Sequence, residues 1–560
     1  MNTATFFTFC REAASALLFP SQYSIVNSLL LIFFGLGIFL VATYLFTLCR
    51  FYATRGPKSR FAGSEPPTVP YWIPFVGSAL SMVTDPHKFF METLVKRPDK
   101  GPMTMRLGPI RMYLIMGADN IQSVFRYSRQ LSFEFMQLRI AEKVKGLPAH
   151  DAQQLGADDS GTGSAPLSNI TENGRIWHKL HAIYLKNLTE KKAVDFLTDK
   201  FVSEFSKQLQ SVPWQYETMG LLGFLQKYQF NASTTTLVGP RILDFSPQFV
   251  NNFWDYDAAF MTLMQGMPRF MRRGGWAARD RCLEATKEWL AAATENSGRS
   301  NITPDDDPDW DENFGHRLVR ERNAALLNYG ISFDGRAAMH MGLIWAINAN
   351  AIPMTAYMLI EMVRNPSLLQ RIRSEVQTAM VPGKESSSAL AVDIEKLSSL
   401  PLLNSVYNEC LRLRSSIPIS RRLRVDVEID GYTLKANNFI LAPSWVSHIN
   451  EDVWAHSGHP ASEFWAERFL EKKSRKVKLG DYCPYGGGNV ICPGRFFAKH
   501  EILAAVALVV TFYDMEFVRY SKLDGAPSER GPGIDKAECR GIVSLDRDVV
   551  VDFRKRSILL

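Results

Sequence analysis

The sequence predicts a mainly α-helical protein with a small β part, preceded by a single apolar helix near the N-terminus. Residues 29–48 are almost entirely apolar and carry no charge. Between residues 118 and 415 apolar side chains recur mostly at helical spacing, whereas alternation is confined to short runs such as residues 421–442. These two spacings indicate helices and half-buried strands respectively. A hydrophobic fraction of 46% over 560 residues is enough for a large core.

The N-terminal apolar segment has the length of a membrane anchor. Its sequence LLLIFFGLGIFLVATYLFTL, residues 29–48, matches the roughly 20 residues that span a bilayer core. It is too long for the core of a signal peptide. Arg50, Arg55, Lys58 and Arg60 follow it, and the positive-inside rule therefore places the rest of the chain in the cytosol.

Four regions are predicted along the chain. Residues 1–24 form a lumenal segment and residues 25–49 the transmembrane anchor. Residues 50–70 are basic and rich in proline, which disfavours a helix and favours a semi-rigid linker. Residues 71–560 form one folded domain.

Charge and cysteine content exclude several classes of protein. The chain has 64 basic and 57 acidic side chains, a net charge of +7, and no basic tract with interleaved aromatic residues. Nucleic acid is therefore not an expected partner. The seven cysteines are widely spaced and include no CxxC pair, which argues against a disulfide framework and against structural zinc.

The β part is expected in three places. Residues 103–117 contain two β-prone runs around Gly108 and Pro109, a pattern typical of a hairpin. Residues 421–442 alternate around the turn signal Asp430-Gly431, and residues 542–556 alternate again. Loops are expected at residues 156–169 and 303–315.

Two cysteines lie close together in CPYGGGNVICPGRFF, residues 483–497. Cys492 is followed by Pro493, which suits the first turn of a helix, and by the apolar run 494–513. A cysteine at a helix N-terminus faces unpaired N–H groups, which favour the thiolate that binds metals. Cys483 is followed by Pro-Tyr-Gly-Gly-Gly, which cannot begin a helix. Cys492 is the better metal ligand of the two.

The spacing around Cys492 resembles a known signature. Tyr485, Gly488, Cys492, Gly494 and Ala498 fill the pattern Y-x-x-G-x-x-x-C-x-G-x-x-x-A, which is similar to the haem-thiolate loop of cytochromes P-450. The resemblance implies a cytochrome P-450 fold and a haem b whose iron is held by Cys492. It also implies dioxygen as co-substrate and NADPH as electron source through a partner reductase.

Two further motifs of that family are present upstream of the loop. Glu409 and Arg412 fill Glu-x-x-Arg in NECLRL, and Arg468 lies in FWAERF, where Ala466 replaces the proline of the family. Alone, a Glu-Arg pair three residues apart is a weak signal. In this order, the resemblance implies a buried charge triad that supports the haem-binding core.

The residues that would bind the haem propionates are less regular. The family often has Trp-x-x-x-Arg on an early helix, and this chain has Trp177 and His181. Haem carboxylates need cationic partners. The candidates for a further cation are Arg421, Arg422 and Arg424, of which we choose Arg424. The arginine or histidine that the family commonly has two residues before the cysteine is Val490 here.

The distal helix departs from the usual pattern of the family. Residues 343–365 read as one long helix, with Ser332 or Asp334 as an upstream cap. The acid-alcohol pair that relays protons is replaced by Ala349, Asn350 and Pro353, and Asn348 adds a second amide. Because Pro353 has no N–H, it frees the carbonyl of Ala349.

The run W-A-x-x-A-N-x-I-P-x-T on this helix resembles the cholesterol 7-alpha-hydroxylase, sterol 12-alpha-hydroxylase and prostacyclin synthase group. The resemblance implies a haem-thiolate monooxygenase with its catalytic domain, residues 71–560, on the cytosolic side of the endoplasmic reticulum membrane as a single-pass protein. Its substrate is expected to be a hydrophobic polycycle, namely a sterol, triterpenoid or meroterpenoid, in a pathway similar to fungal secondary metabolism. NADPH-cytochrome P-450 reductase is expected to dock near Arg495 and Lys499.

Two alternatives remain open at this point. The missing acid-alcohol pair also suits a haem-thiolate isomerase or dehydratase that acts on a peroxide without a reductase. A non-catalytic membrane-tethered protein that binds haem or sterol is the second alternative.

Overall fold

The structure is a computed structural model of the whole chain. The residues that it describes are 25–55, 63–97, 100–296, 307–382, 390–456, 458–470, 477–533 and 540–557. The predicted lumenal segment 1–24 lies outside the described residues, as do Lys58 and Arg60 of the linker.

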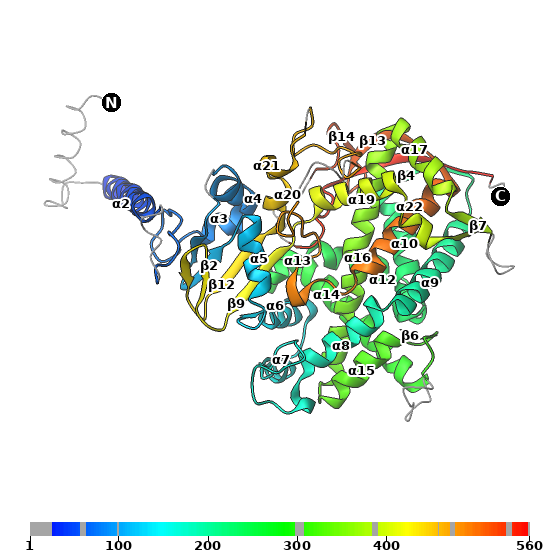
Figure 1. The fold of residues 1–560 in the computed structure, drawn as a ribbon, viewed down its shortest axis with the longest axis horizontal. Coiled ribbons are helices and arrows are strands. Elements are labelled where there is room, and N and C mark those ends of the chain that lie inside the picture. Colours follow the sequence, from blue (N-terminus) through cyan, green and yellow to red (C-terminus); the bar gives the residue numbers. More distant parts are fainter. Residues whose placement is uncertain are drawn as a thin grey trace.

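The predicted anchor is a helix that projects from the body of the molecule (Figure 1). This helix, α2, spans Ile25–Thr54 and so continues past residue 49. Among the described residues, two helices are long and apolar enough to cross a membrane: Ser28–Thr54, whose most apolar 18-residue stretch is unburied, and Phe333–Val363, which is mostly buried inside the protein. Only the first has the exposed apolar surface expected of an anchor.

The C-terminal end of α2 contacts the folded domain. The hydroxyl of Thr47 donates to the carbonyl of Tyr71 at 3.2 Å, and Phe51 is only 1% exposed because it packs with Phe90 and its neighbours. The N–H of Val69 donates to the carbonyl of Thr104 at 2.9 Å. The end of the anchor and the segment before Tyr71 therefore lie on the domain.

The larger sheet lies next to α2, on the opposite side of the molecule from most helices (Figure 1). Its strand order is β1-β2-β12-β9-β3, and β12 runs parallel to β2 whereas the other pairs are antiparallel. The predicted hairpin forms with Gly108 at φ 62° between β1 and β2. The strands are β1 Met103–Leu107, β2 Ile110–Leu114, β12 Phe439–Pro443, β9 Pro418–Leu423 and β3 Leu131–Ser132.

The remaining strands form small sheets. The Asp430-Gly431 turn joins β10 and β11, and both residues have positive φ, 52° and 76°. The second sheet has the order β14-β13-β15-β4. The bounds are β4 Tyr216–Gly220, β5 Trp310–Asp311, β6 Gly315–His316, β7 Met380–Pro382, β8 Leu390–Val392, β10 Val427–Ile429, β11 Tyr432–Leu434, β13 Tyr513–Lys522, β14 Pro527–Ser528 and β15 Arg547–Lys555.

Helices make up most of the domain, as the sequence predicts. The short N-terminal ones are α3 Ala79–Thr84, α4 Pro86–Phe90, η3 Met91–Val95, α5 Ala118–Arg126, α6 Glu134–Ile140, η4 Ala141–Lys145 and α7 Ala149–Gly156. The main body contains η5 Glu172–Gly174, α8 Ile176–Thr189, α9 Lys191–Gln210, α10 Leu221–Val238, α11 Arg241–Phe245, α12 Phe249–Ala258, α13 Phe260–Met264, η6 Arg269–Met271, α14 Arg273–Asn296, α15 Arg317–Asn328 and α16 Phe333–Val363. The last are α17 Pro366–Gln377, α18 Ile394–Leu397, α19 Pro401–Arg414, α20 Ser444–His448, α21 Glu451–Trp454, η7 Gly488–Val490 and α22 Arg495–Phe512.

Two apolar helices, α16 and α22, cross the centre of the helical body and pack against each other (Figure 1). Both are buried around nearly their whole circumference, which is why their sequences are apolar on every face. Helix α16 begins at Phe333 because the hydroxyl of Ser332 caps it by accepting from the N–H of Gly335 at 3.1 Å. It ends at Val363 rather than at residue 365, since Asn365 caps the next helix α17.

The C-terminal prediction needs a correction. Alternation from residue 542 suggests one strand, but β15 begins only at Arg547. The preceding residues form a loop whose backbone bonds to the end of α19: the N–H of Val543 donates to the carbonyl of Arg414 at 2.9 Å. The apolar residues Ile542 and Val543, at the start of the predicted strand, are buried in that loop rather than in a sheet.

Candidate active site

The loop that carries Cys492 is held by its own backbone at the start of α22. The N–H of Cys492 donates to the carbonyl of Tyr485 at 3.1 Å, which closes the loop. Gly494 is the N-cap of α22, so the first N–H groups of the helix, those of Gly494 and Arg495, are directed at the sulfur. The first amides of a helix have no acceptor within the helix, so they are free to face such a group; the N–H of Arg495 also donates to the carbonyl of Cys492 at 3.5 Å.

The two cysteines of the loop have different surroundings. Burial raises the pKa of the Cys492 thiol, but the N–H groups of Gly494 and Arg495 and the Arg495 charge act in the opposite direction. The effect of burial is larger, so the pKa of Cys492 is raised overall. The lowering expected from the helix start is present but only partly offsets this rise. Burial together with the Asp481 charge raises the pKa of Cys483 to about 12, with no opposing group. Cys483 is therefore an inert buried thiol.

The glycines of the loop are required by close packing. A side chain at Gly487 would place Cβ 2.4 Å from the ring of Phe125, and Gly488 has φ 69° with its Cβ position 3.1 Å from the carbonyl oxygen of Phe125. A Cβ at Gly494 would lie 3.8 Å from the Cys492 sulfur. The first two positions thus fix the loop against α5, and the third keeps the space beside the sulfur free.

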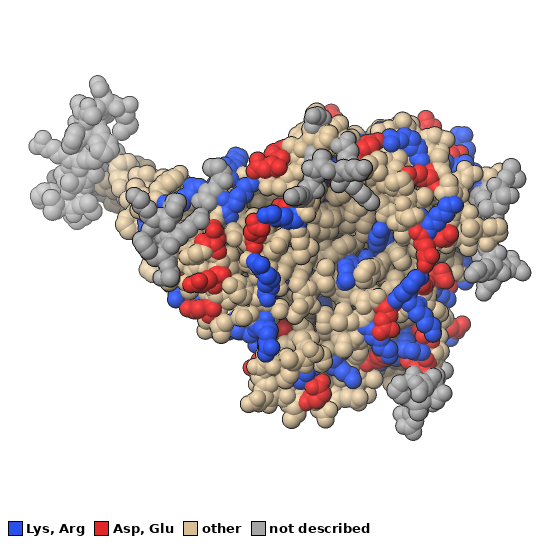
Figure 2. Space-filling view, in the orientation of Figure 1, with Lys and Arg blue, Asp and Glu red and all other residues tan. Residues whose placement is uncertain are grey.

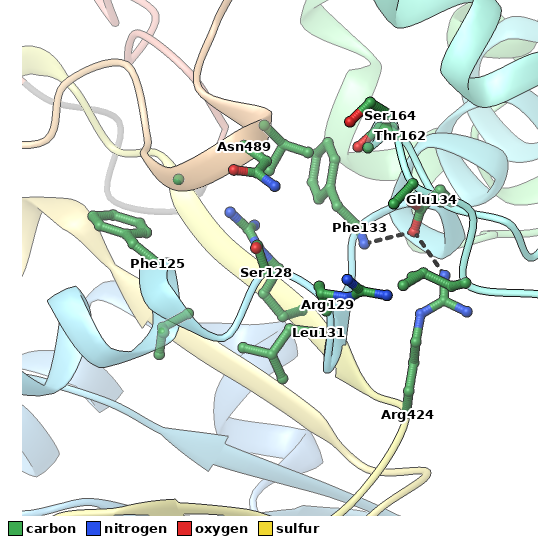
Figure 3. Close-up of a pocket in the computed structure, with 18 residues that line it drawn as sticks. Phe125, Ser128, Arg129, Leu131, Phe133, Glu134, Thr162, Ser164, Arg424 and Asn489 are labelled. Atoms are coloured by element: carbon green, nitrogen blue, oxygen red, sulfur yellow. Dashed lines mark hydrogen bonds and ion pairs between the residues drawn. The ribbon is translucent and has the colours of Figure 1, made fainter.

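A cavity of about 290 Å³ opens beside this loop (Figure 3). Its wall includes the loop residues Gly488, Asn489 and Val490, the segment 161–165, and the three arginines Arg129, Arg421 and Arg424. Figure 3 shows the Arg424 guanidinium paired with Glu134; the distance between Nη2 and Oε2 is 3.5 Å.

The arginine candidates differ in burial and in partners. Arg421 is 7% exposed and donates only to the backbone carbonyls of Ser420 and Gly487, at 2.8 and 3.2 Å. Burial lowers its pKa to about 10. Arg422 is exposed, and Arg424 is paired with Glu134. Within the described part of the chain, Arg421 is a buried cation without an ion pair, which is an expensive arrangement unless an anion binds there.

Trp177 and His181 do not line this cavity. The indole N–H of Trp177 donates to the carbonyl of Leu155 at 3.0 Å, so it has a protein partner. Burial, with a smaller contribution from His178, lowers the pKa of His181, which therefore is mostly neutral near pH 7.

The predicted charge triad forms and is fully buried. Glu409 accepts from Nε of Arg412 at 2.8 Å and from Nε of Arg468 at 2.8 Å, and all three side chains are 0% exposed. The remaining guanidinium N–H groups donate to backbone carbonyls, including those of His448 and Ala461 at 2.6 Å. The triad therefore ties α19 to the segment before the cysteine loop.

A pair of phenols lies between the triad and the cysteine. The hydroxyl groups of Tyr485 and Tyr407 share a short hydrogen bond, and burial raises the pKa of both phenols. The charge of Cys492 adds to the rise at both tyrosines, which indicates that both lie near the sulfur. Tyr485 thus joins α19 to the cysteine loop through its side chain as well as its backbone.

The distal residues lie on α16, but the two asparagines face different ways. The side-chain oxygen of Asn350 accepts from the N–H of Ile542 at 2.9 Å, whereas Asn348 donates to Thr234 at 3.2 Å and is fully buried against α10. Asn348 therefore does not supply a polar group on the Asn350 side, contrary to the expectation from sequence. Pro353 lies inside the helix, so the carbonyl of Ala349 lacks its helical donor.

A buried ion pair connects the C-terminal loop to α12, next to α16. Nη1 of Arg540 lies 2.8 Å from Oδ1 of Asp257 at the end of α12, and the indole N–H of Trp345 donates to the same oxygen at 2.8 Å. The ring of Phe260 stacks on Trp345 with centroids 4.7 Å apart. These contacts join α12, α13, α16 and the C-terminal loop.

Several of these residues were missed at the sequence level. Arg175 is buried and donates to Glu172 and to the carbonyl of Ser164, which holds the segment 161–165 at the cavity wall. Arg421 was among the three arginine candidates, and its burial could have been predicted because it shares alternating positions with the buried Ile419 and Leu423 of β9. Nothing local to residue 540 predicts its partner Asp257, which lies 283 residues away.

Known proteins resemble most of the chain. The sequence model of the cytochrome P-450 family matches residues 66–526. Cytochrome P-450 monooxygenase calL of Penicillium decumbens is 30% identical over 510 residues, covering 87% of this chain and 95% of that protein. Cholesterol 7-alpha-monooxygenase of Cricetulus griseus is 25% identical over 491 residues, covering 82% and 89%. The fold is similar to that of cyanobacterial CYP120A1, solved with retinoic acid bound, with a TM-score of 0.62, 16% identity and coverage of 88% and 100%.

The helical fold and these matches define a haem-thiolate oxygenase. The chain belongs to the cytochrome P-450 family, and it is a cytochrome P-450 monooxygenase. Membership implies a haem held by a cysteine thiolate, dioxygen as co-substrate and electrons supplied by a reductase. The predicted family and fold are confirmed, as is the predicted similarity both to fungal monooxygenases and to the cholesterol 7-alpha-hydroxylase group.

Proposed function

We propose that the protein oxidises a hydrophobic polycyclic substrate of the sterol, triterpenoid or meroterpenoid class, with the haem iron held by Cys492. One observation carries the assignment of the ligand: the N–H groups of Gly494 and Arg495 are directed at the Cys492 sulfur, whereas only groups that disfavour a thiolate surround Cys483. When bound, the haem supplies the activation of dioxygen and the insertion of one oxygen atom into a C–H bond.

The residues around the loop fit a haem. Gly494 leaves room beside the sulfur, Gly488 lets the loop pack against Phe125, and Tyr485 holds the loop closed. Arg421 is buried without a carboxylate partner in the described part of the chain and faces the cavity beside Gly488. We infer that Arg421 binds a propionate, and that Arg424, the choice from sequence, gives secondary support because its charge is shared with Glu134.

Trp177 and His181 remain propionate candidates, with weaker support. A neutral His181 can donate one hydrogen bond but contributes little charge. The triad of Glu409, Arg412 and Arg468 has a structural part in the proposal, since it fixes the segment that leads to the cysteine.

We propose that the distal side orients water for proton delivery without the usual acid and alcohol. The groups that take this part are Asn350, Pro353 and the carbonyl of Ala349. The Asn350 amide oxygen accepts from Ile542, which leaves its NH₂ group as a donor. The carbonyl freed by Pro353 is an acceptor one residue away. An amide and a carbonyl can hold and orient water but do not themselves titrate near pH 7.

The substrate class rests on similarity. Relatives in this comparison include a fungal monooxygenase and a cholesterol 7-alpha-monooxygenase, so we place this chain in secondary metabolism with a polycyclic substrate. The surface supports no rival macromolecular ligand on the face shown in Figure 2, where Lys and Arg are interspersed with Asp and Glu around a central hollow.

We further propose that α2 spans the endoplasmic reticulum membrane once and that residues 71–560 are cytosolic. The exposed apolar surface of α2 and the arginines that follow it support this orientation. The partner would be NADPH-cytochrome P-450 reductase, docking near Arg495 and Lys499 at the start of α22.

The assignment is tested with two cysteine variants. The ferrous carbonyl spectrum of the full-length protein should show the red-shifted Soret band in the wild type and in Cys483→Ser, and Cys492→Ser should lose it. Loss of the band in Cys483→Ser alone would overturn the proposal, since that outcome would make the buried thiol the iron ligand.

A second candidate function is favoured by the missing acid-alcohol pair. Without it, the same site could isomerise or dehydrate a peroxide with no external electrons. Reconstitution with reductase separates the two, because the monooxygenase forms product only when NADPH is present. A binding protein without turnover would give no oxidised product under either condition.

A further inference from the structure

Lys145, at the end of η4, is a cation that the proposed site does not use. Its side chain lies across Gly342 of α16: a Cβ at that glycine would be 2.3 Å from Cε and 2.6 Å from Nζ of the lysine. The absence of a side chain at residue 342 is therefore what lets the lysine pass over the helix. The turn η4 packs against α13, α14 and α16, and the ammonium lies against α16 at Gly342.

The surroundings of Lys145 supply positive rather than negative charge. Burial and, to a smaller extent, the nearby Arg322 lower its pKa to about 8. Arg322 is 1% exposed and donates to Tyr184, His340 and the carbonyl of Met339, none of which is a carboxylate. No hydrogen bond or ion pair is made by Lys145 within the described residues. A half-buried lysine and a buried arginine, neither with an acidic partner among the described residues, would attract an anion.

Lys145 also faces the side of α16 that carries the distal residues. Ala346 and Asn350 follow Gly342 at intervals of four residues, so the three positions lie along one side of the helix. Ala346 is exposed although most of α16 is buried, which indicates that this side borders a hollow. At about 1.5 Å per residue, Gly342 lies about 12 Å along the helix from Asn350.

We propose that Lys145 is a substrate-recognition residue whose ammonium binds a carboxylate at the far end of an otherwise apolar substrate. The inference rests on the proposed function, because it places the reacting carbon near Asn350 and the acid about 12 Å away, near Gly342. This spacing suits a polycycle or a long chain that carries an acid at one end. The class of substrate is thereby narrowed from a neutral sterol-like molecule to an apolar acid.

The test compares acids with their methyl esters, which keep the apolar body and remove the charge. Full-length holoenzyme is titrated at pH 7 with hexadecanoic acid and its methyl ester, and with the pentacyclic oleanolic acid and its methyl ester, and Kd is taken from the shift of the Soret band. The wild type should bind at least one acid about 10- to 100-fold more tightly than its ester, the range for a hydrogen bond to a buried charge. Lys145→Met should abolish that ratio and leave the Kd of the ester within about twofold.

The matched control is Lys143→Met, an exposed lysine on the same turn of η4, which should keep the wild-type ratio. A second measurement needs no spectral shift: acetic anhydride should modify Lys145 at pH 8, as read by mass spectrometry, and the acid but not the ester should protect it. Equal Kd values for acid and ester in the wild type, or the same loss for both ligands in Lys145→Met, would overturn the inference. The carbonyl spectrum of these variants stays intact either way, so failure here is distinct from failure of the iron ligand.

Discussion

Replacing Glu409 by glutamine gives the sharpest test of how the haem-binding core is held together. The carboxylate accepts four hydrogen bonds: two from Arg412 at 2.8 and 2.9 Å, one from Arg468 at 2.8 Å and one from the N–H of Trp465 at 3.0 Å. A glutamine has nearly the same shape but no charge, and one of its ends is an NH₂ group that must face a guanidinium donor. Both arginines would then be buried cations with only carbonyl acceptors.

The expected cost is large. Removing one partner of a buried ion pair costs about 3–5 kcal/mol because the other charge is left uncompensated. At about 2.1 cal/mol/K of unfolding entropy per residue, a chain of 560 residues shifts by about 1 °C for each kcal/mol, so the midpoint of thermal unfolding should fall by about 3–5 °C. The assay is circular dichroism at fixed scan rate, with the carbonyl spectrum measured before heating. Glu428→Gln, on the exposed side of β10, is the control and should shift the midpoint by less than about 1 °C.

One outcome would refute this reasoning directly. If Glu409→Gln unfolds within about 2 °C of the wild type, then the buried charges are compensated by the backbone carbonyls alone. The triad would in that case be dispensable for stability.

The other predictions concern three buried contacts. Burial raises the pKa of Glu501 to about 7, so the folded protein holds a proton that the unfolded chain releases near pH 4. The free energy of unfolding therefore falls as the pH rises through 7, by up to about 3 kcal/mol. Denaturant unfolding at pH 5 and pH 8 should show this loss in the wild type and not in Glu501→Gln; an equal loss in both would contradict it. Gly541→Ala should lower the unfolding midpoint by several degrees, because its Cβ would lie 2.1 Å from the amide oxygen of Asn350, and an unchanged midpoint would show that the loop yields freely. Asp257→Asn and Arg540→Met should each destabilise by about 3 kcal/mol but together by less than the sum, as measured by a double-mutant cycle; simple additivity would argue against the ion pair.

The parts of the site that sequence predicts are those encoded within a few residues. Cys492, its helix and the flanking glycines form one continuous stretch, so their relation to one another is set by local backbone geometry. Glu409 and Arg412 share one helical face for the same reason. The family pattern then supplied Arg468, which local physics alone could not have linked to them.

The parts that sequence does not predict depend on contacts between distant segments. Which arginine of β9 is buried depends on the pleat of that strand, which buries Arg421 and exposes Arg422. Arg424, just after the strand, also lines the cavity but is paired with Glu134, so among the described residues Arg421 is the buried candidate without a carboxylate. Asn348 and Asn350 look equivalent in the sequence, but the helical turn sends them to opposite partners. Lys145 lies on a π-helical turn, which no simple apolar spacing reveals.

The bonds made by the C-terminal loop also bear on how the chain is made in the cell. During synthesis, the partner of Asn350, Ile542, is added 192 residues after it. The interval between Asp257 and its partner Arg540 is longer, at 283 residues. At 5–20 residues per second, a ribosome needs about 10–40 s to supply the partner of Asn350. Until then the Trp345–Asp257 hydrogen bond joins α12 and α16 without the Arg540 ion pair and the Ile542 hydrogen bond that the loop adds. During that interval Asn350 and Asp257 lack these partners, and the nascent chain most needs protection from aggregation.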